Sequence, residues 1–142
     1  MNPESNSIAV DGQEDLIASS KRQRTKVLNH YMNAKEDFLA AWIKAIERIG
    51  PDYFECEGIE NFKLATDRDQ IRPNWDAIEE RINVCSIGEG VLIGAVMSFF
   101  NGKWGAGICH CFGYHGIGDA ANRLDLDELT IIIELMSSHT GW

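Results

Sequence analysis

Basic residues are scarce in this chain: 13 lysines and arginines stand against 22 aspartates and glutamates, which leaves a formal charge of −9. Proteins that bind nucleic acids need a basic surface to neutralise the phosphates. We therefore expect no direct binding of nucleic acid. The same negative charge suits a partner protein with a basic surface, because opposite charges speed up association.

No apolar run is long enough to cross a bilayer, which requires about 20 mostly apolar residues. The most apolar stretch, residues 86–102, is interrupted by Gly94 and Ser98. The first residues show neither the basic start nor the apolar core of a signal peptide. We therefore expect a cytoplasmic protein that does not enter the membrane.

Recognisable motifs are also missing. The glycines match neither of the common phosphate-binding patterns, GxxxxGK[ST] or GxGxxG. The four cysteines do not suggest the disulfide framework of a small secreted protein, and we expect reduced thiols. A chain of 142 residues that is 44% hydrophobic can bury an ordinary core. The polar segment 1–12 predicts a disordered tail, and 13–142 a single mainly helical domain.

Hydrophobic periodicity predicts a mainly α fold of four to five helices. Trp42 lies in the middle of an amphipathic segment that ends at Gly50 and is therefore expected in the core. The spacing of Ser86 and Glu89 predicts a capping box at the start of a buried helix, and Asp125 predicts the cap of the last helix. The expected inner face of that last helix is Leu126, Leu129, Ile132, Ile133 and Met136, with Ile131 and Leu135 beside it.

The stretch 95–111 has a second interpretation, which would make the fold α+β with a short strand or hairpin there. The pair Asn101-Gly102 is a strong hairpin signal, because both positions tolerate positive φ. We favour a helix that ends at Phe100, followed by an irregular glycine-rich segment, 103–118. In that helix Gly90 and Gly94 would share a face and let a second backbone approach closely.

Residues 52–72 have no regular period and are rich in acidic side chains. They hold either a short strand at 61–65 or only an ordered loop. The acids lack the spacing of a calcium-binding loop, so we expect a solvated surface that meets the basic partner. Together with three aromatic residues from later in the chain, the candidate partner-binding residues are Glu55, Glu57, Glu60, Asp67, Asp69, Trp104, Tyr114 and Trp142.

These features predict a small acidic protein-binding protein that has no catalytic residues and no cofactor. An inhibitor, or an immunity- or anti-defence-type protein of a phage or mobile element, would fit the small size, the acidity and the missing catalytic motifs. Neither the identity of the partner nor the oligomeric state follows from the sequence.

The alternative is a small enzyme or a zinc-binding module centred on residues 109–115. In an extended segment Cys109 and Cys111 would point the same way and, with His115 and Cys85, could bind zinc through thiolates and imidazole. Against zinc, Cys-x-Cys is shorter than the usual Cys-x₂₋₄-Cys spacing. A thiol nucleophile at Cys111, with His115 as base and Asp119 to orient it, would require a helix that the nearby glycines oppose.

Overall fold

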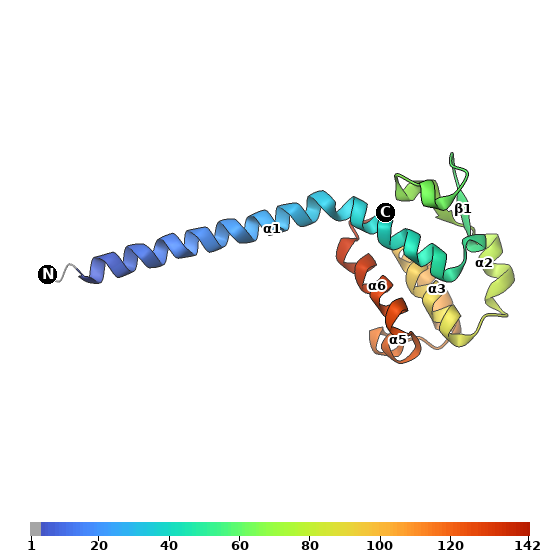
Figure 1. The fold of residues 1–142 in the computed structure, drawn as a ribbon. Helices are drawn as coiled ribbons and strands as arrows, with labels where there is room; N and C mark the ends of the chain where they lie inside the picture. The colour runs from blue at the N-terminus through green and yellow to red at the C-terminus, as the bar shows by residue number, and fades with distance from the viewer. Residues whose placement is uncertain (1–3) are drawn as a thin grey trace. The chain divides into compact units, whose positions relative to one another are not determined.

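The computed structural model describes residues 4–142, and their side chains from Gly12 onward (Figure 1). Helix accounts for 76% of the structure, which confirms the mainly α class with a small hairpin. The described α-helices are α1 (Glu4–Ile49), α2 (Trp75–Ile82), α3 (Ile87–Phe100), α4 (Gly102–Cys111), α5 (Ile117–Arg123) and α6 (Leu126–Ser138). Strands β1 (Phe54–Cys56) and β2 (Ile71–Pro73) pair in antiparallel orientation. Three short 3₁₀ helices are η1 (Pro51–Tyr53), η2 (Phe62–Leu64) and η3 (Arg68–Gln70).

Contacts group residues 34–142 into one unit and the residues up to 33 into another. Helix α1 begins at Glu4, in the unit up to residue 33 and inside the segment 1–12 that was predicted as a disordered tail. Serine and asparagine are only mildly unfavourable in helices, so the polar composition is compatible with one. Residues 1–3 lie outside the described residues, and the domain boundary at residue 12 stays a prediction. A set of exposed apolar residues follows on α1: Leu16, Ile17, Val27, Leu28, Tyr31 and Met32.

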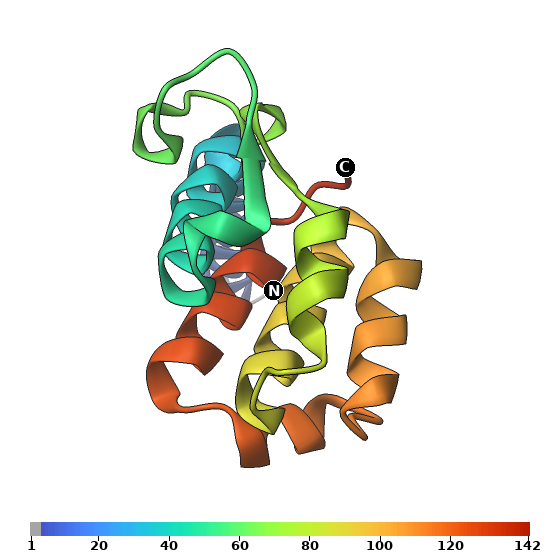
Figure 2. The ribbon, with the colours of Figure 1, turned by 90° about the vertical axis from the view of Figure 1, so that its right-hand side faces the viewer.

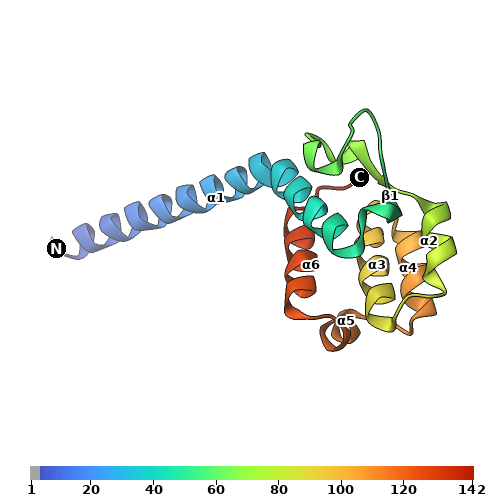
Figure 3. The ribbon, with the colours of Figure 1, turned by 45° about the vertical axis from the view of Figure 1, so that its right-hand side comes forward.

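The core of the unit 34–142 is built around α3, which lies between α6 and α4 (Figure 3). Every residue from Gly90 to Met97 is buried, which confirms the prediction of a buried helix. The predicted capping box is present. The amide of Glu89 donates to Ser86 Oγ (3.2 Å), and the amide of Ser86 donates to Glu89 Oε2 (3.0 Å).

Helix α4 packs closely on α3 because glycines lie where the two helices meet. A Cβ atom on Gly105 would lie 2.4 Å from the backbone nitrogen of Ser98. A Cβ atom on Gly94 would lie 2.5 Å from Cys109 Sγ and 3.0 Å from the Cys109 nitrogen, which confirms the close approach predicted at that glycine. At Gly90 the neighbour is a side chain, the ring of Phe112.

The stretch 95–111 is helical, so the alternative prediction of a hairpin there is wrong, as is the prediction of an irregular segment from residue 103. Asn101 is extended (φ −143°, ψ 106°), not left-handed. Its side chain accepts hydrogen bonds from the amides of Lys103 and Trp104, both at 3.1 Å, and so caps α4. The strands lie instead on both sides of segment 61–65. That segment holds the 3₁₀ helix η2, so of its two predicted alternatives the short strand is wrong.

The second half of α1 supplies another wall of the same core. Trp42 is fully buried, as predicted. Its indole N–H donates to the carbonyl of Ile71 at 3.1 Å, which joins α1 to β2. The rings of Phe38 and Phe54 pack on Trp42 with centroid separations of 5.9 and 5.7 Å.

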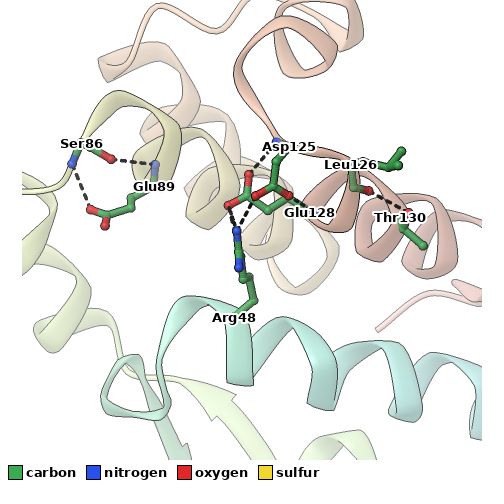
Figure 4. A network of polar contacts seen from close by, with 7 residues as sticks. All are labelled: Arg48, Ser86, Glu89, Asp125, Leu126, Glu128 and Thr130. Atoms are coloured by element: carbon green, nitrogen blue, oxygen red, sulfur yellow. Dashed lines mark hydrogen bonds and ion pairs between the residues drawn. The ribbon is translucent and has the colours of Figure 1, made fainter.

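Arg48, near the end of α1, joins that helix to the first turn of α6 (Figure 4). Its guanidinium donates to Asp125 Oδ2 and to Glu128 Oε1. The same two carboxylates form a capping box, in which the Glu128 amide donates to Asp125 Oδ1 (2.8 Å) and the Asp125 amide to Glu128 Oε2 (3.0 Å). The predicted cap at Asp125 is confirmed, and the start of α6 is fixed against α1.

Helix α6 buries a different face from the one predicted. Its buried residues are Ile131, Ile132, Leu135 and Ser138. Of the predicted inner face only Ile132 is buried, whereas Leu126, Ile133 and Met136 are 78%, 62% and 52% exposed. The helix is apolar on two overlapping stripes, and periodicity does not distinguish which stripe the rest of the protein covers.

Candidate functional site

The acidic arm, which we define as residues 52–69, runs from η1 through β1 and η2 toward β2. It lies at the opposite end of the unit 34–142 from α5 (Figure 2). The predicted partner-binding acids Glu55, Glu57, Glu60, Asp67 and Asp69 are all exposed on it. The structure therefore places these carboxylates where another protein can reach them, and their role in binding stays a prediction.

The basic residues of the acidic arm are engaged within the unit. Lys63 Nζ lies 2.8 Å from Glu47 Oε1. The guanidinium of Arg68 lies over the rings of Trp142 (4.6 Å) and Phe38 (5.2 Å). Among the described residues, no ion pair joins the glutamates of the arm to a basic side chain. The arm therefore presents mainly negative charge to solvent.

Trp142 folds back onto the core beside the acidic arm. Its ring centroid is 5.0 Å from that of Trp42 and 4.9 Å from that of Phe100. Arg68 also donates a hydrogen bond to the carbonyl of Gly141, which holds this segment against the arm. Trp142 remains 37% exposed, so part of its ring borders the acidic surface.

The other two predicted aromatic residues lie at opposite ends of α4. Trp104, in the first turn, is half-buried and packs on Trp75 with a centroid separation of 4.6 Å. Tyr114 follows the last turn, and its amide donates a hydrogen bond back to the carbonyl of Cys109 at 2.9 Å. Burial, followed by the nearby Cys109 and Asp119, raises the pKa of Tyr114. The eight predicted residues therefore do not form one surface.

The candidate zinc ligands are separated by the helical conformation of α4. Cys109 and Cys111 are two residues apart in a helix, so their side chains are separated by a rotation of about 200° about the helix axis and lie on opposite faces. Cys109 is buried, which raises the pKa of its thiol, and Cys111 is exposed. Cys85 lies beside the hydroxyl of Tyr53, at 3.5 Å. Among the side chains that the structure describes, those of residues 12–142, no three from histidine, cysteine or acidic residues are arranged to hold a metal ion. The absence of a cofactor stays a prediction.

The residues of the predicted thiol nucleophile, Cys111 with His115 and Asp119, do not lie on one helix. Cys111 lies in the last turn of α4, and His115 and Asp119 follow in the next loop and helix. Asp119 Oδ2 accepts a hydrogen bond from the backbone amide of His115 at 2.8 Å. The carboxylate thus stabilises the start of α5.

An open groove of about 900 Å³, which we call the apolar groove, was not predicted. Residues of α3 form its floor, α4 and α6 form its walls, and α5 contributes Ile117 and Ala121 at one end. The α6 wall consists of the buried Ile132 and of four residues on its outer stripe, Leu126, Leu129, Ile133 and Met136. Polar groups lie along the α4 side, where the rings of His110 and His115 are 6.3 Å apart and Tyr114 lies next to them.

The four residues of this outer stripe follow steps of three, four and three residues, the spacing of a coiled-coil seam. Three of them are more than half exposed. The sequence prediction had placed these residues in the core because it assigned the wrong stripe of α6 to the inner face. The signal that could have revealed the groove is the second apolar stripe of α6.

Comparisons with known proteins assign no family. No protein-family model matches the chain, and neither a curated protein nor a solved structure shows significant similarity to it. Within residues 4–142, none of the helices has the length and apolarity required to cross a membrane. The acidic arm and the apolar groove therefore carry the functional interpretation.

Proposed function

We propose that this protein is a cytoplasmic, noncatalytic protein-binding protein that docks on a basic surface of another protein. The acidic arm makes the electrostatic contact, and the neighbouring Trp142 adds aromatic contact area. A small acidic protein that covers a basic surface also blocks it. The proposal therefore includes an inhibitor, or an immunity- or anti-defence-type protein of a phage or mobile element.

The observation that supports this proposal is the unbalanced charge of the acidic arm. Its glutamates are exposed, while Lys63 and Arg68 are engaged with other residues of the unit. Exposed charges of one sign steer an oppositely charged partner before contact, so they raise the association rate more than they lower the dissociation rate. Salt screens this steering over about 8 Å at physiological ionic strength.

The test begins with capture of the partner from the native cell on the full-length protein, followed by identification by mass spectrometry. Association and dissociation rates are then measured at several salt concentrations for the wild type and for the triple variant Glu55→Gln/Glu57→Gln/Glu60→Gln. We expect a basic partner, an association rate that falls as salt rises, and a triple variant that loses mainly association rate.

The matched control removes three charges from α2, as Asp76→Asn/Glu79→Gln/Glu80→Gln. These side chains are also exposed, so the change in net charge is the same and only its place differs. The control is expected to keep a faster association rate than the arm variant. Equal losses in both variants, or an association rate independent of salt, would contradict the role of the arm.

A further inference from the structure

We infer that the apolar groove is the contact surface between two copies of this chain, which pair through antiparallel α6 helices about a two-fold axis. Each copy would insert the outer stripe of its α6 into the groove of the other. The inference goes beyond the proposed function, which concerns the acidic arm and Trp142. It rests on the shape of the groove, on the order of the residues along α6 and on the charge of the lining.

The groove holds a ridge and a hollow side by side. The ridge is the outer stripe of α6, on which Leu126, Ile133 and Met136 are more than half exposed. The hollow lies along α4, where the lining includes the small residues Gly102 and Ala106. Small residues leave room for the side chains of a second helix to pack between the ridges of α4. In a two-fold contact both copies use the same surface, so the ridge of each can enter the hollow of the other.

The spacing along α6 suits an antiparallel pair. From Leu126 to Met136 the outer stripe advances by three, four and three residues, and this order is the same when it is read backwards. In an antiparallel pair Leu126 therefore lies opposite Met136 of the second copy, and Leu129 lies opposite Ile133 of the second copy. Every apolar side chain of the stripe thus meets another one, over about 15 Å or nearly three turns.

The lining of the groove allows two copies of an acidic protein to meet there. The chain carries a formal charge of −9, so two copies repel each other wherever their charged surfaces approach. Among the residues that line the groove, all of which belong to the described part of the chain, there is no aspartate, glutamate, lysine or arginine. Contacts between identical subunits are likewise apolar and depleted of charge at their centre.

The acidic side chains of α6 lie outside the groove. Glu134 pairs with Lys44, and Glu128 pairs with Arg48, both of them on α1. Asp127 is rotated by about 100° about the helix axis from its neighbour in the outer stripe. Pairing along the outer stripe therefore does not bring these carboxylates face to face with those of the second copy.

A small ligand fits the groove less well than a second copy does. Pockets for small molecules bury most of the surface of the ligand and are largely enclosed. Here Leu126, Ile133 and Ile117 all stand more than half exposed around the groove. Exposed apolar residues gathered in this way mark surfaces that contact macromolecules.

The first test measures the mass of the full-length protein by sedimentation equilibrium over a range of concentrations, and the wild type is expected to dimerise. Ile133→Glu places a charge in the middle of the outer stripe of both copies. The dissociation constant of the dimer should therefore rise at least about a hundredfold. The matched control is Val84→Glu, at a residue that is 83% exposed and lies between α2 and α3. The control is expected to dimerise like the wild type, and far-UV circular dichroism confirms that the variants are folded.

Two complementary variants test the antiparallel order. Leu126→Glu and Met136→Lys each place a charge against an apolar side chain of the second copy, so each alone should dimerise at least about tenfold more weakly. In a mixture of the two, the introduced carboxylate of one copy lies opposite the introduced amine of the other, and the charges attract. The mixture should therefore form a dimer more tightly than either variant alone. A mixture of Leu126→Glu with Met136→Glu is the control and should show no such recovery.

Salt distinguishes this contact from the one proposed for the acidic arm. Screening weakens the repulsion between two acidic copies, so the dimer should hold or tighten as the salt concentration rises. The association of a basic partner with the arm should instead slow down under the same conditions. A dimer that dissociates as salt rises would contradict a contact without charged residues.

A wild type that is monomeric at every concentration, equal effects of Ile133→Glu and Val84→Glu, or no recovery in the mixture would overturn the inference. So would a dimer that dissociates in Leu28→Glu and persists in Ile133→Glu, because the contact would then lie on the exposed apolar residues of α1. These outcomes leave the proposed function standing, since that function fails only where the partner binds independently of the acidic arm.

Discussion

Helices α3 and α6 are both short, strongly apolar and started by a capping box, yet only α3 is buried on all sides. The difference lies in their small residues. Gly94 of α3 and Gly105 of α4 let the two helices approach until almost no space remains between them. Helix α6 carries leucine, isoleucine and methionine on its second face, which stays exposed.

The contrast between α3 and α6 shows that two properties of an apolar helix are distinct, although composition alone does not distinguish them: whether it packs into the fold, and how closely its neighbours cover it. Apolar content decides that a helix belongs to the fold, because burying apolar area stabilises the folded state. Small residues decide how closely a neighbour can cover it. The second face of α6 has no glycine, and it stays exposed along the apolar groove.

The largest expected effect is on Leu135, the fully buried residue of α6. Leu135→Ala should reduce the free energy of unfolding by about 2–5 kcal/mol, since the side chain leaves a cavity in the core. Ile133→Ala, two positions away and 62% exposed, should change it by no more than about 0.5 kcal/mol. Urea unfolding of both variants measures the difference. Equal losses of unfolding free energy would show that both stripes of α6 are covered, and that α6 does not differ from α3 in burial.

Gly105→Ala tests the close contact between α3 and α4. Its new Cβ would meet the backbone of Ser98, which cannot move without separating the helices, so we expect a loss of about 1–3 kcal/mol. Gly107→Ala is the matched control on the same helix, because a Cβ there meets nothing within 4 Å. The control should be stabilised by about 0.5–1 kcal/mol through its better helix propensity. A stable Gly105→Ala variant would contradict the close packing.

Local signals predicted the parts of the fold that depend on local hydrogen bonds. The capping box at Ser86 and Glu89, the cap at Asp125 and the burial of Trp42 follow from neighbouring residues or simple spacing, and all are confirmed. Helix α4 was missed because its glycines were interpreted as helix breakers. Gly105 is required by the backbone of Ser98, a contact that only the folded structure reveals.

The candidate site was predicted less completely than the fold. The exposure of the acidic arm agrees with its composition, but its basic residues are engaged by Glu47 and by aromatic rings that are distant in sequence. The apolar groove was missed because Leu126 and Ile133 are as apolar as the core residues beside them. Which stripe is covered depends on where α1 and α3 pack, and no local pattern contains that information.

The smallest expected effect concerns His139, which follows α6 and packs on Phe99 near the end of α3. The ring centroids are 5.4 Å apart, and a second aromatic ring, that of Phe38, lies at the same distance. Burial, and secondarily the charge of Arg68, lowers the pKa of His139. The unfolded chain therefore binds a proton at this residue at a higher pH than the folded protein does.

The stability contributed by neutral His139 is present above its ordinary pKa of about 6.5 and is lost as the pH falls below that value. Because the side chain is partly exposed, solvent screening keeps this loss small. We expect the free energy of unfolding, measured in urea, to decrease slightly between about pH 7 and about pH 5.5 in the wild type. In His139→Asn the decrease should be smaller, because the titrating group is gone. An identical decrease in both proteins would show that the ends of α3 and α6 do not hold this histidine between aromatic rings.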